Sequence, residues 1–258
     1  MRPLIAKIKP ASGFSRFFYI SLNALLPLVV FILVRINFVQ LALIIILLSK
    51  WRMLAVRPRF WPANVRANAV DIMVSISLLL FMANSTSQTW QLVWAVLYGI
   101  WLIVIKPASS TLMMSAQAMI GLLCGLMALS TSWVTAPLYG LVFGTGLVCY
   151  IAAHHFFDSY DEPYARLLSY LWGYFGAALM FVLGHGLIFY PRPSDATGFI
   201  SQPTVLLLTL GYGLATMYYC DHANKLTKAV KMQTMLIMSV VVLVMIVSLY
   251  RSLNHLIV

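Results

Sequence analysis

The stretch INFVQLALIIILLSKWRMLAVRPRFWPANVR, residues 36–66, shows the pattern that decides the fold. The part from 36 to 49 carries no charged side chain, whereas the part from 50 to 66 carries five basic residues and no acidic one. Apolar runs flanked by short loops rich in Lys and Arg are typical of the cytoplasmic side of a membrane protein. The stretch therefore predicts a helix in the bilayer followed by a cytoplasmic loop.

The composition of the whole chain agrees with this interpretation. Hydrophobic residues make up 62% of the chain and charged residues 9%, and the mean hydropathy is +0.92. A soluble domain carries about 25% charged residues, so lipid must cover much of the surface of this protein. The net charge of +11 does not indicate a nucleic-acid partner, because the basic residues lie in short loops beside apolar runs.

Nine apolar runs can be drawn along the chain, and no long polar segment separates them. A helix needs about 20 residues to cross the hydrocarbon core, and inside lipid it satisfies its own backbone hydrogen bonds. We therefore predict an all-α polytopic transmembrane helix bundle of about nine spans, with residues 1–258 as one integral membrane domain and no soluble domain. The short run 36–49 leaves open whether it crosses fully. The runs are 17–34, 36–49, 68–84, 90–105, 110–129, 135–153, 167–190, 203–219 and 232–250.

The distribution of basic residues predicts the orientation. With nine spans and a cytoplasmic N-terminus, 14 of the 17 Lys and Arg residues fall on the cytoplasmic side, as the positive-inside rule requires. The three that remain outside are Arg35, Arg192 and Arg251. We expect a multi-pass protein of a cell membrane, of the bacterial inner-membrane type. Its expected partners are the bilayer and anionic lipid headgroups at the cytoplasmic face, and a homo-oligomer or a partner subunit in the membrane stays open.

Several polar side chains are expected at similar depth in the cytoplasmic half of the bundle. Asn68 and Asp71 share one face of the third span, Gln117 lies on the fifth span, and His154 ends the sixth. Acids within spans are costly and usually face a partner or a water-filled cavity. These four residues therefore predict a polar pocket that opens to the cytoplasm. The alternative for Asp71 is an ion pair with an arginine of a loop.

A second candidate site lies in the loop that follows the sixth run. His154, Asp158 and Asp161 lie within one short segment, and carboxylate and imidazole groups so spaced suit a divalent cation. The alternative is structural, because acids followed by Pro163 are also typical of the first turn of a helix, where they cap free backbone N–H groups. The sequence leaves both interpretations open.

The same segment resembles part of a known motif. Asp158-x2-Asp161-x3-Ala165-Arg166 is similar to the first half of the CDP-alcohol phosphotransferase motif, in which aspartates bind a metal ion and cytidine diphosphate. This resemblance implies a metal-dependent membrane enzyme acting on a lipid-phosphate substrate. It covers only this segment. Glu162 stands where that family has glycine, and the second half of the motif, with two more aspartates, has no counterpart here.

His185 is the remaining candidate residue, in the outer half of the seventh run. The glycines on either side would let another helix or a ligand approach it closely. A lone histidine in a bundle is more often a packing residue with a hydrogen bond. No motif in the chain identifies a cofactor.

Three functions are compatible with these patterns. The first is a transporter or channel for a small solute or ion, favoured by the sparse polar groups within the spans. The second is an accessory or assembly subunit of the membrane that does no chemistry. The third is the metal-dependent enzyme at the cytoplasmic face, with Asp158, Asp161 and His154 as ligands.

Overall fold

The computed structural model describes residues 13–132, 137–186, 189–192 and 195–257, and this part of the chain is almost entirely helical. It contains ten α-helices, four short helical segments and one pair of strands. The elements in chain order are α1 (Gly13–Arg35), α2 (Val39–Ser49), η1 (Trp51–Met53), η2 (Pro58–Phe60), α3 (Trp61–Ala67), α4 (Ala69–Asn84), α5 (Gln88–Ile100), η3 (Trp101–Ile105), α6 (Thr111–Ser132), α7 (Leu138–Asp158), α8 (Ala165–Leu183), η4 (Gly184–Gly186), β1 (Phe189–Arg192), β2 (Asp195–Ser201), α9 (Gln202–His222) and α10 (Lys228–Ile257).

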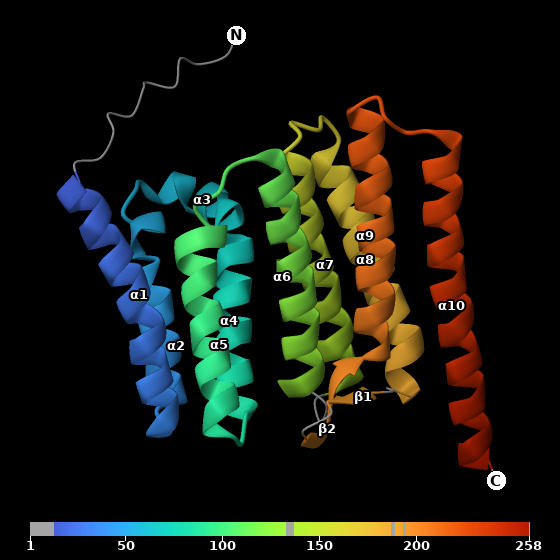
Figure 1. Ribbon diagram of the computed structural model, residues 1–258, viewed down its shortest axis with the longest axis horizontal. Coiled ribbons are helices and arrows are strands. Elements are labelled where there is room, and N and C mark those ends of the chain that lie inside the picture. The colour runs from blue at the N-terminus through green and yellow to red at the C-terminus, as the bar shows by residue number, and fades with distance from the viewer. Residues whose placement is uncertain (1–12, 133–136, 187–188, 193–194, 258) are drawn as a thin grey trace.

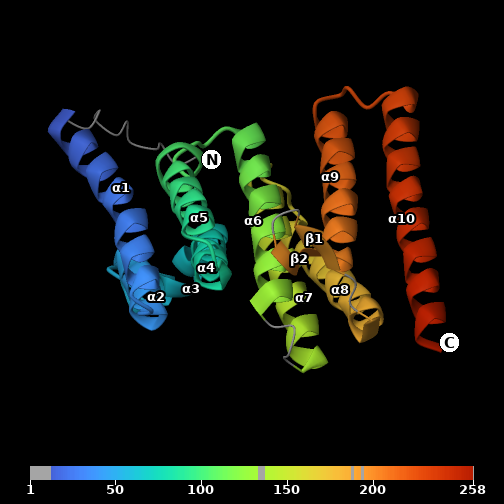
Figure 2. The same cartoon turned by 60° about the horizontal axis from the view of Figure 1, so that its bottom comes forward.

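The long helices lie side by side and follow one another across the molecule. Figure 1 shows them from α1 at one edge to α10 at the other, and the turned view of Figure 2 keeps that order. The connections 50–60, 106–110, 159–164 and 223–227 lie together at the upper end of Figure 1. We call this the basic end, because most of the Lys and Arg residues outside the apolar runs lie in or beside these connections.

Several helices are long and apolar enough to cross a membrane. Within the described residues five meet both conditions, namely α5 with η3, α6, α7, α8 and the part of α10 from Lys228 to Ser248. The segment Pro58–Ala67 and helix α4 meet them together, with a bend of 62° between the two. Helix α2 and the apolar part of α1 are shorter. The helical class is confirmed, and each of the nine apolar runs contains a helix.

The seventh run differs from its expected extent. The apolar pattern predicts a helix up to residue 190, but α8 ends at Leu183 and is followed by η4 and by the antiparallel pair β1–β2. Gly184 and Gly186 are poor helix formers, and Pro191 cannot donate a helical hydrogen bond. The local chemistry therefore favours an early end of the helix. The hairpin lies at the end of the bundle opposite the basic end (Figure 1).

Glycines let α7 and α8 pack very closely. A Cβ atom added at Gly173 would lie 3.0 Å from the carbonyl oxygen of Gly146 and 3.1 Å from the Cβ atom of Tyr150. A Cβ atom at Gly176 would lie 2.5 Å from the Sγ atom of Cys149. Small residues allow this kind of close approach between helices in lipid, where van der Waals packing drives association.

We expect Gly173→Ala to destabilise the bundle by about 1–3 kcal/mol, because the added methyl meets backbone that cannot move aside. Gly99→Ala is the matched control, since its Cβ atom would meet only a Pro27 side-chain carbon at 3.9 Å. The free energy of unfolding in detergent micelles measures both. Equal effects of the two substitutions would contradict the close packing of α7 on α8.

Candidate functional site

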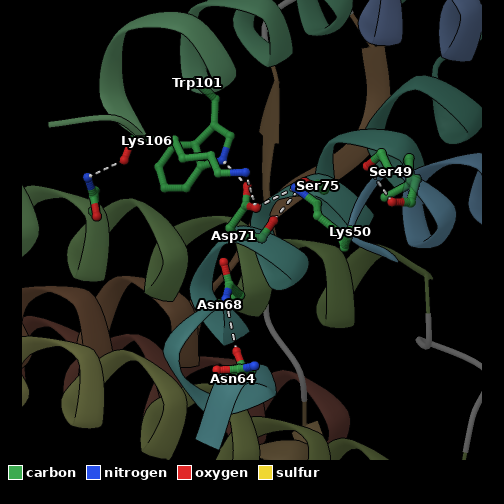
Figure 3. A network of polar contacts seen from close by, with 10 residues as sticks. Ser49, Lys50, Asn64, Asn68, Asp71, Ser75, Trp101 and Lys106 are labelled. Carbon is green, nitrogen blue, oxygen red and sulfur yellow. Dashed lines mark hydrogen bonds and ion pairs between the residues drawn. The ribbon is translucent and has the colours of Figure 1, made fainter. Parts of the chain in front are cut away.

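Asp71 is the centre of a buried charge cluster near the basic end (Figure 3). It lies in the first turn of α4 and is 6% exposed. Its Oδ2 atom pairs with the ammonium groups of Lys50 and of Lys106, the latter at 2.7 Å. Its Oδ1 atom accepts a hydrogen bond of 3.0 Å from the indole N–H of Trp101. The alternative of an ion pair for Asp71 is therefore right in kind, but the partners are lysines and not a loop arginine.

The shortness of α2 explains why a lysine is buried here. Helix α2 has 11 residues, so it is about 16 Å long at about 1.5 Å per residue, roughly half of the hydrocarbon thickness. Lys50 follows its last residue and is only 6% exposed. The ammonium group of Lys50 is paired with the Asp71 carboxylate. A buried ammonium group needs such a partner.

A local change of helix type brings Trp101 and Lys106 to the same carboxylate. In an α-helix, residues five apart point about 140° away from each other. Segment η3 is a π-helical turn, in which the N–H of Lys106 donates to the carbonyl oxygen of Trp101 at 2.8 Å. This wider turn places residues five apart near the same face. Both side chains can therefore reach Asp71.

Gln117 closes the other side of this turn. Its side-chain amide donates to the carbonyl oxygens of Ile105 at 2.7 Å and Ala108 at 2.9 Å, at the helix end where carbonyl groups lack partners. Its Oε1 atom lies 3.0 Å from Nε2 of His155. Because an amide oxygen only accepts, Nε2 of His155 carries the hydrogen. Gln117 thus joins α6 to η3 and to α7.

The other members of the predicted polar pocket lie apart from this contact. Asn68 donates to the carbonyl oxygen of Asn64 at 2.9 Å, along its own helical segment. His154 is next to His155 in the chain, but its ring packs on Tyr150, with centroids 5.8 Å apart. The structure thus brings Asp71 together with two lysines, and Gln117 together with His155. It does not gather the four predicted side chains into one group.

The acidic segment forms the turn between α7 and α8. Asp158 is the last residue of α7, and its carbonyl oxygen accepts the N–H of Asp161, whose φ angle is 51°. Oε1 of Glu162 accepts the N–H of Tyr164 at 3.4 Å, just before α8 begins. Among the described residues no three side chains of His, Cys, Asp or Glu lie together as metal ligands would. The metal interpretation with His154 stays a prediction.

His185 lies in η4, and its side chain contacts the preceding helix. Its Nδ1 atom is 2.8 Å from the carbonyl oxygen of Phe181, and its ring packs edge-on against the Phe181 ring. The histidine is exposed. Both contacts hold the His185 side chain against the C-terminal end of α8.

An apolar cavity lies between helices α6 to α10. Its volume is about 570 Å³, within the range of sites for small molecules. It extends along α9 from Leu210 to Tyr218, about 12 Å at about 1.5 Å per residue. None of the polar residues predicted as sites lines it. The residues that line the cavity include Ala118, Leu122, Ala152, Phe156, Phe157, Trp172, Gly211, Ala215 and Met238.

Aromatic rings form the end of this cavity nearest the basic end, and one of them is hydrogen-bonded to a carboxylate. Tyr218 lines the cavity, and its hydroxyl donates to Oε2 of Glu162 at 2.5 Å. The Tyr218 ring packs against Phe156 and Phe157 with centroids 5.6 and 5.4 Å apart, and against Tyr160 at 5.3 Å. This group could not be predicted from the sequence, because Tyr218 lies on α9 and its partners lie on α7 or in the connection after it.

Comparison with known proteins found no matching family, no similar curated protein and no similar solved structure.

The charge balance around Asp71 predicts an asymmetric response to mutation. Asp71→Asn leaves two buried or half-buried lysines without a counter-ion, so we expect a loss of about 3–5 kcal/mol in the free energy of unfolding. Lys50→Met keeps the pair of Asp71 with Lys106 and should cost less. The double substitution should cost less than the sum of the two single ones, because it leaves one lysine that can reach water.

Unfolding of the four proteins in detergent micelles, as a double-mutant cycle, measures this coupling. Asp161→Asn is the control, since that side chain is exposed and makes no ion pair among the described residues. It should change stability by no more than about 0.5 kcal/mol. Strictly additive effects of the Lys50 and Asp71 substitutions would show that the ion pair does not stabilise the fold.

Proposed function

We propose that this chain is a multi-pass protein of a cell membrane, of the bacterial inner-membrane type, with about nine spans and a cytoplasmic N-terminus. The apolar helices support the membrane assignment. The gathering of basic connections at one end supports the orientation, because Lys and Arg favour the cytoplasmic side. Anionic lipid headgroups are the proposed partners of that end. Exposed Arg57 and Arg59 with exposed Trp51 and Trp61 suit the headgroup region.

Reporter fusions test the orientation. Alkaline phosphatase is active only outside the cytoplasm, so a fusion after residue 86 should be active and fusions after residues 108 or 226 should not. A fluorescent protein that folds only in the cytoplasm should give the reverse pattern at the same three positions. Phosphatase activity at 108 or 226 would reverse the proposed orientation.

The function that we propose within this membrane is the binding of an amphipathic molecule, for storage or for transport. The apolar cavity between α6 and α10 is the observation that supports it. Pathways for ions and polar solutes are lined by charged side chains or carbonyl groups. This cavity is lined mainly by alkyl and aromatic groups, which suit a hydrocarbon chain. Of the transport functions, one with an amphipathic cargo fits best.

The polar side chains support the same choice. Asp71 and Gln117 are already bound to lysines, an indole and backbone carbonyl groups. Groups satisfied in this way hold helices together. The cavity thus offers apolar contact area to a cargo, while the buried charges maintain the scaffold beside it.

Filling the cavity should remove the bound molecule. Ala215 lines the cavity on α9, so Ala215→Phe places a ring in the space that a hydrocarbon chain would occupy. Ala178→Phe is the matched control, because Ala178 is exposed on α8 and does not line the cavity. The measurement is mass spectrometry of amphipathic lipids extracted from each protein after purification in detergent.

We expect about one copy of an amphipathic molecule per chain in the unsubstituted protein and in Ala178→Phe, and a clear loss in Ala215→Phe. Equal amounts in all three proteins, or none in any of them, would contradict the proposed function. The cavity would then be a packing gap, and an accessory subunit would be the better interpretation.

A further inference from the structure

We propose that the end of the cavity at Tyr218 selects an amphipathic molecule with a positively charged amine or quaternary ammonium headgroup. This inference rests on the proposed function, since it names the headgroup of the molecule whose chain lies in the cavity. It assigns Glu162 and the rings beside it as the headgroup site. It is opposite in sign to what the net charge of +11 suggests.

The chemistry at this end of the cavity favours a cationic headgroup. Tyr218, Phe156 and Phe157 line the cavity, and the Glu162 carboxylate contacts the Tyr218 hydroxyl. Aromatic faces attract ammonium groups, and this attraction is the basis of quaternary ammonium recognition by proteins. A carboxylate beside the rings adds direct charge attraction. Among the carboxylates of the described residues, Glu162 is the one that accepts a hydrogen bond from a residue lining the cavity.

The local charge near this end of the cavity also favours a cationic headgroup. Of the six acidic residues in the chain, four lie in the α7–α8 connection or at the adjacent end of α9. None of these four makes an ion pair within the described residues, whereas Asp71 makes two. Arg166 and Lys225 are exposed and unpaired with these acids, and the His222 ring packs against the Tyr160 and Tyr218 rings with centroids 5.2 and 6.2 Å apart. The four acids are Asp158, Asp161, Glu162 and Asp221.

The position of these acids disfavours an anionic headgroup at the cavity. A phosphate or carboxylate beside Tyr218 would approach Glu162 without an ion-paired lysine or arginine to offset the repulsion. The loop that holds Arg57 and Arg59 belongs to the half of the bundle formed by α1 to α5. The basic end therefore offers two different surfaces, and the cavity ends at the less basic one.

Three probes with the same twelve-carbon chain separate the chain from the headgroup. They are dodecyltrimethylammonium, which is cationic, dodecanol, which is neutral, and dodecanoate, which is anionic. Binding is measured by calorimetry to the full-length protein in maltoside micelles, with empty micelles as the blank. We expect dodecyltrimethylammonium to bind about tenfold more tightly than dodecanol, and dodecanoate to bind more weakly than dodecanol.

Variants then assign the preference to Glu162. Glu162→Gln should bring the cationic probe to the affinity of dodecanol and leave dodecanol itself unchanged. Asp161→Asn changes the charge equally but lies on an exposed residue without a contact to Tyr218, so it should reduce the preference by about twofold at most. Glu162→Ala also removes the charge and should likewise remove the preference, so it serves if Glu162→Gln does not fold.

The outcomes distinguish the headgroup site from the cavity. Equal binding of the three probes, with loss of all binding in Ala215→Phe, would overturn the headgroup inference and leave the proposed function intact. No binding of any probe would overturn both. A preference for the cationic probe that persists in Glu162→Gln or in Glu162→Ala would remove Glu162 as the selecting group.

Discussion

The carboxylate of Asp71 is the group on which the architecture of the first half of the bundle depends. Helix α2 is too short to carry Lys50 to the membrane surface, so the chain turns back with an ammonium group inside the protein. Asp71 balances that charge and also holds Lys106 and Trp101. Removing one partner of such a cluster leaves an uncompensated charge in a medium that solvates it poorly. The Asp71 carboxylate therefore connects α4 to η3 and to the end of α2.

One consequence of this arrangement extends into the second half of the bundle. The π-helical turn that brings both Trp101 and Lys106 to Asp71 ends at Ile105, and carbonyl groups at a helix end lack helical partners. The side-chain amide of Gln117 on α6 donates to the carbonyl oxygens of Ile105 and Ala108. Its Oε1 atom is hydrogen-bonded to His155 of α7. A single buried charge thus accounts for a chain of polar contacts from α2 to α7. Asp71 and Gln117 thus have partners within the protein.

The membrane class and the positions of the helices could be predicted from the sequence, because apolar runs and basic loops are local patterns. Asp71 could be recognised as important, since an acid in an apolar run is costly. Its partners could not, because their approach depends on the length of α2 and on one π-helical turn. The cavity could not be predicted from the sequence either, since alanines such as Ala118, Ala152 and Ala215 form it only when separate helices meet.

The charge of the protein as a whole and the charge near the cavity differ, and the local charge decides what binds there. Screening limits electrostatic forces between exposed groups to about 8–10 Å at physiological salt. A headgroup beside Tyr218 therefore interacts with Glu162 at contact distance and with neighbouring groups, more than with lysines at the far side of the basic end. Three of the six acids of this basic chain, Asp158, Asp161 and Glu162, lie at the end of α7 or in the connection that follows it, close to the Tyr160 and Tyr218 rings. The basic residues carry the proposed orientation in the bilayer, whereas the unpaired acids carry the headgroup preference that we propose for the cavity.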